Sequence, residues 1–408
     1  MSKLHLEHGW LSMNKAGEQL CGDHVETVNR EDSVIMVLAD GLGSGVKASI
    51  LSTLTSKILA TMLAGDMTVE DCVETIALTL PVCSVRQVAY CTFTILRVDK
   101  YTGEVYLVQF DNPDLILLRQ GRIYDYPKEK REIAGKTIYE TRLMGYIGDM
   151  FIMMSDGAIH AGVGTVLNFG WQQPEIAEYA QRVWTPDLSA KSMAAKISDA
   201  CRELYMDIPG DDTTVAALRI RKRQQVNLMI GPPTDPAQDE EIMGGFFALE
   251  GKTIVCGGTT STVVGRYLGK AVCPTLDFFD PDIPPVATIQ GVDLCTEGVI
   301  TLGRVVALAT QCLSNQIGEP TWLTTKDGAS LIARLLFEEA TNVNFYVGRA
   351  MNPAHQNPDL PLNLNLKLRL VEELLPGPPG DARSGGGTGP VPYRYGKDRL
   401  GAVLLSQI

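Results

Sequence analysis

Three aspartates stand beside apolar runs of the chain, at points where strands are expected to end or begin. Asp40 closes the run VIMVLAD, Asp156 follows FIMMS, and Asp211 opens DDTTVAAL. A buried carboxylate is costly unless it is paired, hydrogen-bonded or bound to a metal. Hard divalent cations prefer carboxylate, carbonyl and water oxygens. We therefore expect these aspartates to meet at one edge of a sheet and to bind Mg²⁺ or Mn²⁺.

The remaining composition narrows the class of protein. The five histidines and nine cysteines form no CxxC, HExxH or close Cys/His cluster, so zinc fits poorly. An odd number of scattered cysteines is typical of buried thiols in a reducing compartment. The net charge of −12 argues against a nucleic-acid partner. Without a signal pattern or an apolar run of membrane-spanning length, we expect a cytoplasmic protein that does not enter a membrane.

Hydrophobic patterning divides the chain into three parts. Residues 1–222 contain groups of strands separated by helices, which is typical of a layered α+β domain. The basic run RIRKRQQ at 219–225 is expected to be a solvated junction. Residues 226–375 alternate strand, Gly/Pro turn and helix, which indicates a smaller α/β domain. Residues 376–408, rich in Gly and Pro, are expected to be disordered.

Helical spacing predicts a helix at 47–63 that starts directly after a Gly-rich turn. Its free N–H groups and partial positive charge would face the aspartates and favour an anionic substrate. The apolar residues at helical spacing in this segment are Ile50, Leu51, Leu54, Ile58, Leu59 and Met62.

Four short motifs follow one another in the first domain: LCGDHVE, which contains Asp23, then ADGLGSGVKAS, MSDG and GDDTTV. In this order and at these intervals they resemble the metal-dependent protein phosphatases of the 2C type, and within them the bacterial stage II sporulation phosphatase branch. The resemblance covers residues 1 to about 220. FDNPDLILLRQG, with Asn112, is similar to the family's Asn-containing turn. The implied fold is an α-β-β-α sandwich of two antiparallel sheets flanked by helices.

The resemblance also implies roles for single residues. Asp40 would bridge two metal ions, and Gly41 would bind through its backbone carbonyl. Asp156 and Asp211 would be ligands of one of these ions, and Asp23 would act through a bound water or from behind the direct ligands. Further neighbours of the site would be Asp212, Gly157 and Asn112.

The implied reaction is hydrolysis of phosphoserine or phosphothreonine on a phosphorylated bacterial regulatory protein. Water activated between two Mn²⁺ or Mg²⁺ ions would be the nucleophile. The eukaryotic branch has a His directly after the metal-binding Asp-Gly, proposed as proton donor, where this chain has Leu42. His24 and His160 are nearby, but we expect surface or packing roles for both, so the acid is unassigned. The alternative is a catalytically weak, phosphatase-like binding protein.

A second feature lies in IVCGGTTSTVVGRYLG of the α/β domain, which reads as strand, turn and helix. Such a turn presents N–H groups and hydroxyls to an anion, although it lacks the Lys of a P-loop and GxGxxG spacing. The other interpretation is a plain helix N-cap built from Thr259 to Ser261. The polar loop at 348–363 is either functional or a rigid connector. We expect a sensory or partner-docking module, and monomer and homodimer remain open. The candidate anion-binding residues are Gly257, Gly258, Thr259, Thr260 and Ser261.

Overall fold

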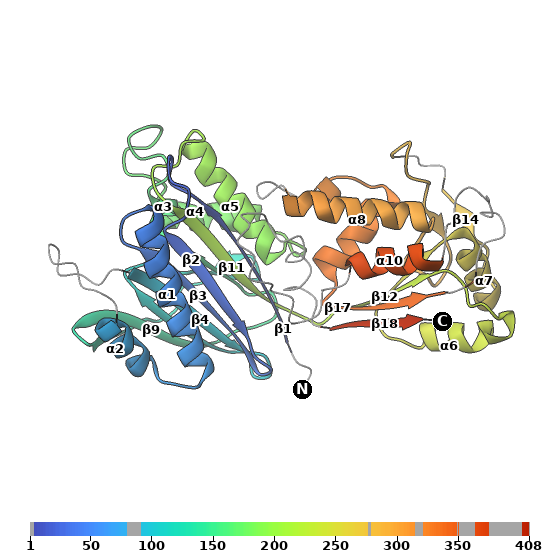
Figure 1. Cartoon of the computed structure of the whole chain (residues 1–408), viewed down its shortest axis with the longest axis horizontal. Coiled ribbons are helices and arrows are strands. Elements are labelled where there is room, and N and C mark those ends of the chain that lie inside the picture. The colour runs from blue at the N-terminus through green and yellow to red at the C-terminus, as the bar shows by residue number, and fades with distance from the viewer. Residues whose placement is uncertain are drawn as a thin grey trace. The chain divides into compact units, whose positions relative to one another are not determined.

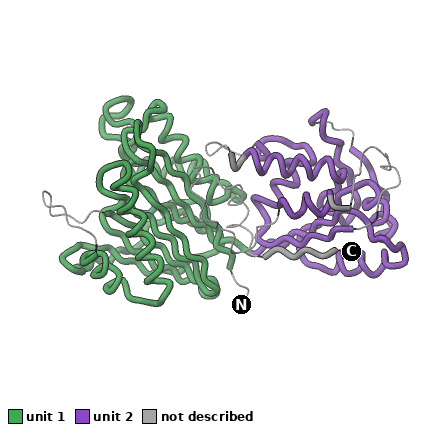
Figure 2. Tube along the Cα trace, in the orientation of Figure 1, with its two compact units in different colours: residues 1–222 green, residues 223–408 purple. Residues whose placement is uncertain are grey.

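A computed structural model describes residues 4–79, 91–275, 279–314, 321–348, 350, 364–374 and 402–407. These residues belong to two compact units, 1–222 and 223–408, which Figure 2 draws in different colours. The division falls inside the basic run. Most of the polar loop 348–363 and of the Gly/Pro-rich segment 376–408 lies outside the described residues.

The first unit is a sandwich of two antiparallel sheets flanked by helices, which confirms the expected fold (Figure 1). One sheet has the strand order β1-β11-β10-β6-β7, and the other has β2-β3-β4-β5-β9-β8. The strands are β1 (His5–Met13), β2 (Asp23–Asn29), β3 (Ser33–Gly41), β4 (Cys91–Asp99), β5 (Glu104–Phe110), β6 (Ile116–Arg119), β7 (Arg122–Ile123), β8 (Glu129–Ile133), β9 (Lys136–Met144), β10 (Met150–Met154) and β11 (Thr213–Arg221).

Apolar side chains fill the space between the two sheets, among them Met36, Leu107 and Phe151. Strands such as β3 and β10 are buried on both faces, which explains why they read as continuous apolar runs. Helices cover the outer faces: α1 and α2 pack on the sheet that contains β3, and α4 and α5 pack on the sheet that contains β10. The helices are α1 (Gly45–Ala64), α2 (Val69–Thr79), α3 (Asp156–Ile159), α4 (Gln173–Val183) and α5 (Ala190–Leu204).

Two differences from the sequence expectations concern the first unit. Strand β8, EKREI, lies at a sheet edge, where charged residues are tolerated, so its apolar pattern is weak. Helix α1 is long and apolar enough to cross a membrane by length and composition, which corrects the expectation that no run approaches that length. In the structure α1 packs on β3, as a core helix of a globular domain does.

The second unit is a mostly parallel sheet with helices on both faces. The parallel strands have the order β16-β13-β12-β17-β18, so consecutive strands wind outward from β12 in one direction and then in the other. The strands are β12 (Gln225–Ile230), β13 (Lys252–Cys256), β14 (Cys273–Pro274), β15 (Ala287–Thr288), β16 (Leu294–Thr296), β17 (Asn342–Val347) and β18 (Ala402–Gln407).

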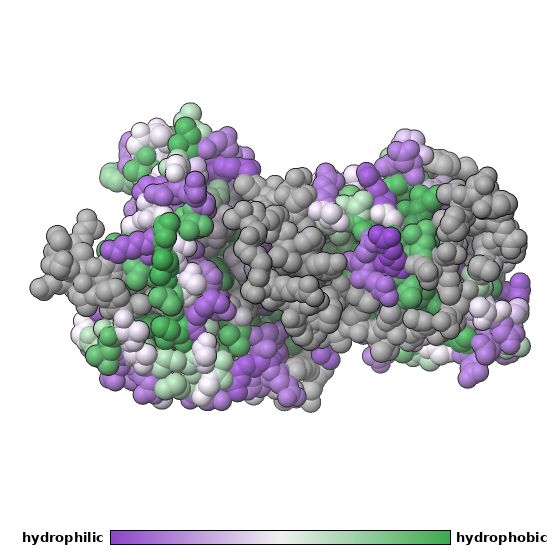
Figure 3. All heavy atoms as spheres, in the orientation of Figure 1, coloured by the Kyte–Doolittle hydropathy of each residue, from purple (hydrophilic) through white to green (hydrophobic). Residues whose placement is uncertain are grey.

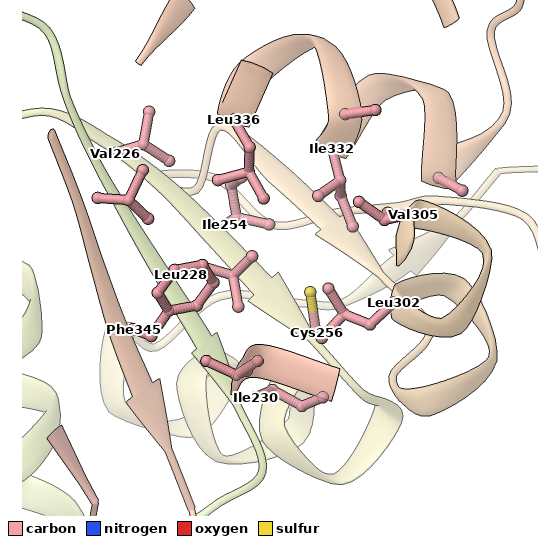
Figure 4. Close-up of a cluster of buried hydrophobic side chains, with 14 of the residues drawn as sticks. Val226, Leu228, Ile230, Ile254, Cys256, Leu302, Val305, Ile332, Leu336 and Phe345 are labelled. Atoms are coloured by element: carbon pink, nitrogen blue, oxygen red, sulfur yellow. The ribbon is translucent and has the colours of Figure 1, made fainter. Parts of the chain in front are cut away.

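Each face of this sheet has its own core. Helices α6 and α7 pack on one face, where Met229, Phe246 and Val264 are buried. The larger core on the other face includes Leu228 and Phe345 and is shown in Figure 4. The helical elements are η1 (Pro236–Gln238), α6 (Asp239–Phe247), α7 (Gly258–Leu268), α8 (Val299–Ser314), η2 (Thr321–Leu323), α9 (Gly328–Ala333), the π-helix η3 (Arg334–Glu339) and α10 (Leu364–Leu374).

Two further differences concern the second unit. Residues 402–407, part of the segment expected to be disordered, form β18 and pair in parallel with β17. The short run AVLLSQ has the apolar character that an added strand needs. Helix α7 begins at Gly258, not at 262, so Thr259 to Ser261 lie in its first turn and Gly257 is the N-cap. The N-cap interpretation of Thr259 to Ser261 is therefore wrong.

Candidate catalytic carboxylates of the first unit

The strand pairing of the first unit brings the predicted aspartates to one edge. Asp23 begins β2 and lies directly opposite Asp40 in the antiparallel pair with β3. In the other sheet Asp156 follows β10, and Asp211 precedes the paired strand β11. A hydrogen bond joins the two sheets here, because the Ser155 hydroxyl donates to Asp23 Oδ2 at 2.7 Å.

Ser155 positions this edge, although the sequence pattern gave it no role. Its Oγ donates to Asp23 and accepts a hydrogen bond from the Thr214 backbone N–H at 2.8 Å. Ser155 is wholly buried. The serine thus fixes the carboxylate of β2 against the start of β11, which lies 59 residues further along the chain from Ser155.

Lys15 is a second residue that sequence reasoning missed. Its backbone N–H donates to Asp212 Oδ1 at 2.9 Å, and its Nζ lies 3.7 Å from Asp211 Oδ1. The loop between β1 and β2 therefore closes over the start of β11. The one available signal was its position in the segment that precedes the motif LCGDHVE.

Two carboxylate oxygens at this edge are buried without a hydrogen-bond partner: Asp23 Oδ1 and Asp212 Oδ2. Asp23 is 5% exposed and Asp212 is 4% exposed. Such atoms lose hydration with no compensating contact, which is costly for a carboxylate unless something else binds it. A divalent cation supplies this contact, so the donor set fits Mg²⁺ or Mn²⁺.

The electrostatics of the edge agree with this fit. Burial, followed by the charges of Asp23 and Asp156, raises the pKa of Asp40 well above its usual range. Burial likewise raises the pKa of Asp23 and of Asp156. The described residues contain no compact cluster of three or more His, Cys, Asp or Glu side chains. The carboxylates are close enough to repel one another, and no ligand cage is preformed.

The glycines after two of these aspartates are required by packing. A Cβ on Gly41 would lie 2.2 Å from the Ala48 carbonyl oxygen, and one on Gly157 would lie 2.1 Å from that of Asp212. Helix α1 and the start of β11 therefore approach the Asp-Gly backbone directly. At Gly41, the backbone of helix α1 occupies the space that a side chain would need.

The family model described as "Stage II sporulation protein E (SpoIIE)" matches residues 30–221. These residues are a SpoIIE-type domain. Comparison with curated proteins gives no match.

Solved structures similar to the chain include the SpoIIE 2C phosphatase domain with a regulatory-domain fragment from Bacillus subtilis. It is 18% identical with a TM-score of 0.46, and the match covers 54% of this chain and 65% of that one. The RsbU and RsbW domains of a Mycobacterium tuberculosis protein are 17% identical with a TM-score of 0.46, covering 60% and 69%. The PstP catalytic domain in complex with two manganese ions is 17% identical with a TM-score of 0.36, covering 54% and 100%.

Asn112 lies beside the carboxylates of the SpoIIE-type domain without joining them. Its Nδ2 donates to Thr94 Oγ1 at 3.3 Å, and its Oδ1 accepts from the hydroxyl of Thr92, the residue opposite Asp40 in the pair of β3 with β4. Asn112 thus fastens the turn after β5 to the strand that supports Asp40.

The two histidines have different surroundings in the SpoIIE-type domain. His24 Nδ1 lies 2.9 Å from Ser56 Oγ of α1, so it links β2 to the covering helix, as expected of a packing residue. His160 is exposed and lies close enough to Asp156 to favour the charged carboxylate. Leu42 is 41% exposed. His160 thus lies near Asp156 of the carboxylate edge.

A cavity of about 410 Å³ in the same domain lies away from this edge, near the end of β4 and the start of α2. Its lining includes Glu70, Arg97 and Arg131. Arg131 donates to Glu140 at 2.6 Å and also to Glu70. The charged side chains that line the cavity are largely paired within the domain. The carboxylate edge therefore remains the candidate site.

Proposed function

We propose that the chain is a Mn²⁺- or Mg²⁺-dependent phosphatase that hydrolyses phosphoserine or phosphothreonine on a bacterial regulatory protein. The observation that carries this proposal is the pair of unpartnered buried oxygens, Asp23 Oδ1 and Asp212 Oδ2, within the carboxylate edge. Among the similar proteins, RsbX was solved with magnesium and PstP with two manganese ions.

The residues that would hold two ions are Asp40, the carbonyl of Gly41, Asp156 and Asp211, supported by Asp23. The burial and unpartnered oxygen of Asp212 give it a stronger claim than its sequence position suggested. When bound, such ions supply Lewis acidity, which lowers the pKa of water and offsets charge on phosphoryl oxygens. Ser155 would hold Asp23 in place, and the loop of Lys15 would limit access of bulk water to the start of β11.

The test of this function uses the purified full chain. We expect hydrolysis of p-nitrophenyl phosphate and of phosphoserine peptides with MnCl₂ or MgCl₂, and none after treatment with EDTA. A chain that binds metal and stays folded but turns over no phosphoester would instead support the phosphatase-like binding protein. Comparison of phosphoproteomes with and without the protein would then identify the substrate.

Metal binding itself is expected to stabilise the first unit. Divalent ions relieve the repulsion among carboxylates and bind only the folded edge, so saturating Mn²⁺ should raise its melting temperature by roughly 5–10 °C. Differential scanning calorimetry with Mn²⁺ and then with excess EDTA measures the shift. An unchanged first transition would contradict the metal assignment, whatever the activity.

We also propose that the second unit binds a small anion between β12 and β17. At this point the order in which successive strands are added to the parallel sheet reverses. Ligands of such sheets bind beyond the carboxyl ends of the strands at this point. Lys367 Nζ lies there, 3.0 Å from the Ala350 carbonyl oxygen and 2.7 Å from a Cβ built on Gly231. Burial lowers the pKa of Lys367, and no described carboxylate pairs with it. The Thr260 hydroxyl accepts from the Gly231 N–H at 3.0 Å and brings the α7 turn beside it.

Substitution of Lys367→Met is expected to weaken binding of inorganic phosphate to the second unit about tenfold. The experiment is done in EDTA, which keeps metal from the first unit. Phosphate raises the melting temperature of the second unit, and this rise should be about 3 °C smaller in the variant than in the wild type. Lys270→Met removes an exposed cation of the same unit and serves as the control. A phosphate-induced shift that persists in Lys367→Met would refute the site.

A further inference from the structure

Helix α1 buries Leu51, Leu59 and Leu63 together with small polar side chains, and it exposes a second set of large apolar side chains. Ser52, Thr55 and Ser56 are wholly buried against the sheet. On the opposite side Val46 is 62% exposed and Ile50 is 54% exposed. Together with Leu54 at 46% and Leu42 at 41%, these side chains form what we call the α1 stripe: Leu42, Val46, Ile50 and Leu54.

Residues four apart lie on one face of a helix, so Val46, Ile50 and Leu54 form a continuous row. Figure 3 shows this row as an apolar stripe along α1. A helix on a sheet normally turns its large apolar side chains to the core. Contiguous exposed apolar patches on a soluble protein commonly mark interaction sites.

The α1 stripe begins at the catalytic edge. Leu42 follows Asp40 by two residues, and α1 starts at Gly45. With a rise of 1.5 Å per residue, the row from Val46 to Leu54 extends for about 12 Å away from that edge. A protein bound to the α1 stripe would thus have one of its own side chains within reach of the carboxylates. The same protein would also contact the enzyme at surface residues that lie further from that side chain.

The size of the α1 stripe argues against a second copy of this chain. A stable dimer buries roughly 800 Å² on each partner, and four half-exposed aliphatic side chains fall well short of this area. A small apolar contact instead suits a transient encounter between enzyme and substrate. The chain's charge of −12 gives no long-range attraction for a phosphorylated protein, so apolar contact beside the site would add affinity that the net charge does not supply.

We propose that the α1 stripe docks the folded phosphoprotein substrate, through an apolar patch that lies beside its phosphorylated Ser or Thr. This proposal rests on the phosphatase function proposed above. It predicts that the protein is selective for a folded phosphoprotein over a short phosphopeptide or p-nitrophenyl phosphate.

The test combines Ile50→Ser with Leu54→Ser in the full chain. Both side chains point to solvent, so we expect kcat/KM for p-nitrophenyl phosphate to stay within about twofold of the wild type. Kcat/KM for the phosphoprotein should fall at least about tenfold, mainly through KM, because docking is uniform binding. Ile300→Ser removes an aliphatic side chain that is 59% exposed in the second unit, and it should change neither activity.

The phosphoprotein is found by comparing phosphoproteomes of cells that carry the wild type, Asp40→Asn or the double variant. Sites that accumulate with Asp40→Asn should also accumulate with the double variant. If they accumulate with Asp40→Asn alone, the docking proposal fails while the phosphatase function stands. If neither variant changes any site and the wild type hydrolyses no phosphoester, the proposed function itself fails.

Other occupants of the α1 stripe would give different results. A second copy would appear as a wild-type dimer that the double variant dissociates in sedimentation experiments. A lipid surface would appear as sedimentation with phosphatidylglycerol vesicles that the double variant loses. Contact with another part of the same chain would lower the melting temperature of the double variant by more than the Ile300→Ser control. Each of these results, without a selective effect on the phosphoprotein, overturns the proposal.

Discussion

Replacement of Asp40 by asparagine is expected to lower kcat/KM for p-nitrophenyl phosphate by about 10³-fold or more. Metal ions contribute several kcal/mol to stabilisation of the transition state, and each 1.4 kcal/mol corresponds to about a factor of ten in rate. Asp40 is the carboxylate that would bind both ions in the proposed site, and it interacts with Asp23, Asp156 and Asp211. Its loss therefore affects the whole site.

The same substitution should leave the metal-free protein as stable as the wild type or more stable. Burial and neighbouring negative charges raise the pKa of Asp40, so its charged form opposes folding. Asparagine has nearly the same shape and carries no charge. The stabilisation by Mn²⁺ should fall sharply in the variant, which calorimetry with and without the ion would show.

Asp125→Asn is the matched control for this experiment, because Asp125 is exposed and far along the chain from the predicted ligands. It should keep full activity and the full Mn²⁺ shift. Wild-type activity in Asp40→Asn, measured in protein shown to be folded by circular dichroism, would exclude Asp40 from the reaction.

The largest expected effect on stability comes from Asp149→Ala. Asp149 is wholly buried and accepts hydrogen bonds from Arg119 at 2.9 Å and from the Tyr146 N–H at 3.0 Å. The Arg119 guanidinium also stacks on the rings of Tyr124 and Tyr146. Removing one member of such a pair leaves a charge without its partner and costs about 3–5 kcal/mol. For a unit of this size the melting temperature should fall by roughly 10 °C.

The double variant Arg119→Met with Asp149→Ala removes both charges of the pair. Comparing its stability with that of Asp149→Ala shows how much of the loss comes from the unpaired Arg119. With both charges gone the Arg119 guanidinium no longer lacks its partner, although the Tyr146 N–H still loses its acceptor, so the double variant should be more stable than Asp149→Ala alone. Thermal and urea unfolding of the first unit, at one fixed concentration of metal, would measure this difference. Equal stability of the single and double variants would show that the interaction contributes little.

Sequence patterns were sufficient for the features that depend on local order along the chain. Apolar runs next to Asp40, Asp156 and Asp211 predicted strand ends, and the antiparallel pairing places them there. Helical spacing predicted α1 at 47–63, and it spans Gly45–Ala64. The resemblance carried by the four motifs also implied the sandwich fold that the structure has.

Contacts between distant segments were not accessible in this way. The bond from the Lys15 N–H to Asp212 spans 197 positions, and the bond from Ser155 to Asp23 spans 132. The ranking of Asp211 above Asp212 followed motif position, whereas burial makes Asp212 the residue with an unpartnered oxygen. Burial is a property of the assembled sheets, which no local pattern contains.

Helix α1 shows most clearly what the sequence determined and what only the tertiary structure decided. Its sequence determined that it is a helix and that apolar residues such as Ile50 and Leu54 recur at helical spacing. Only the tertiary structure decided which face is buried. The Gly41 backbone lies so close to Ala48 that a Cβ on Gly41 would clash with it, and at this close approach Ser52 and Ser56 face the sheet. Ile50 and Leu54 consequently face solvent, in a row that leads away from the carboxylate edge.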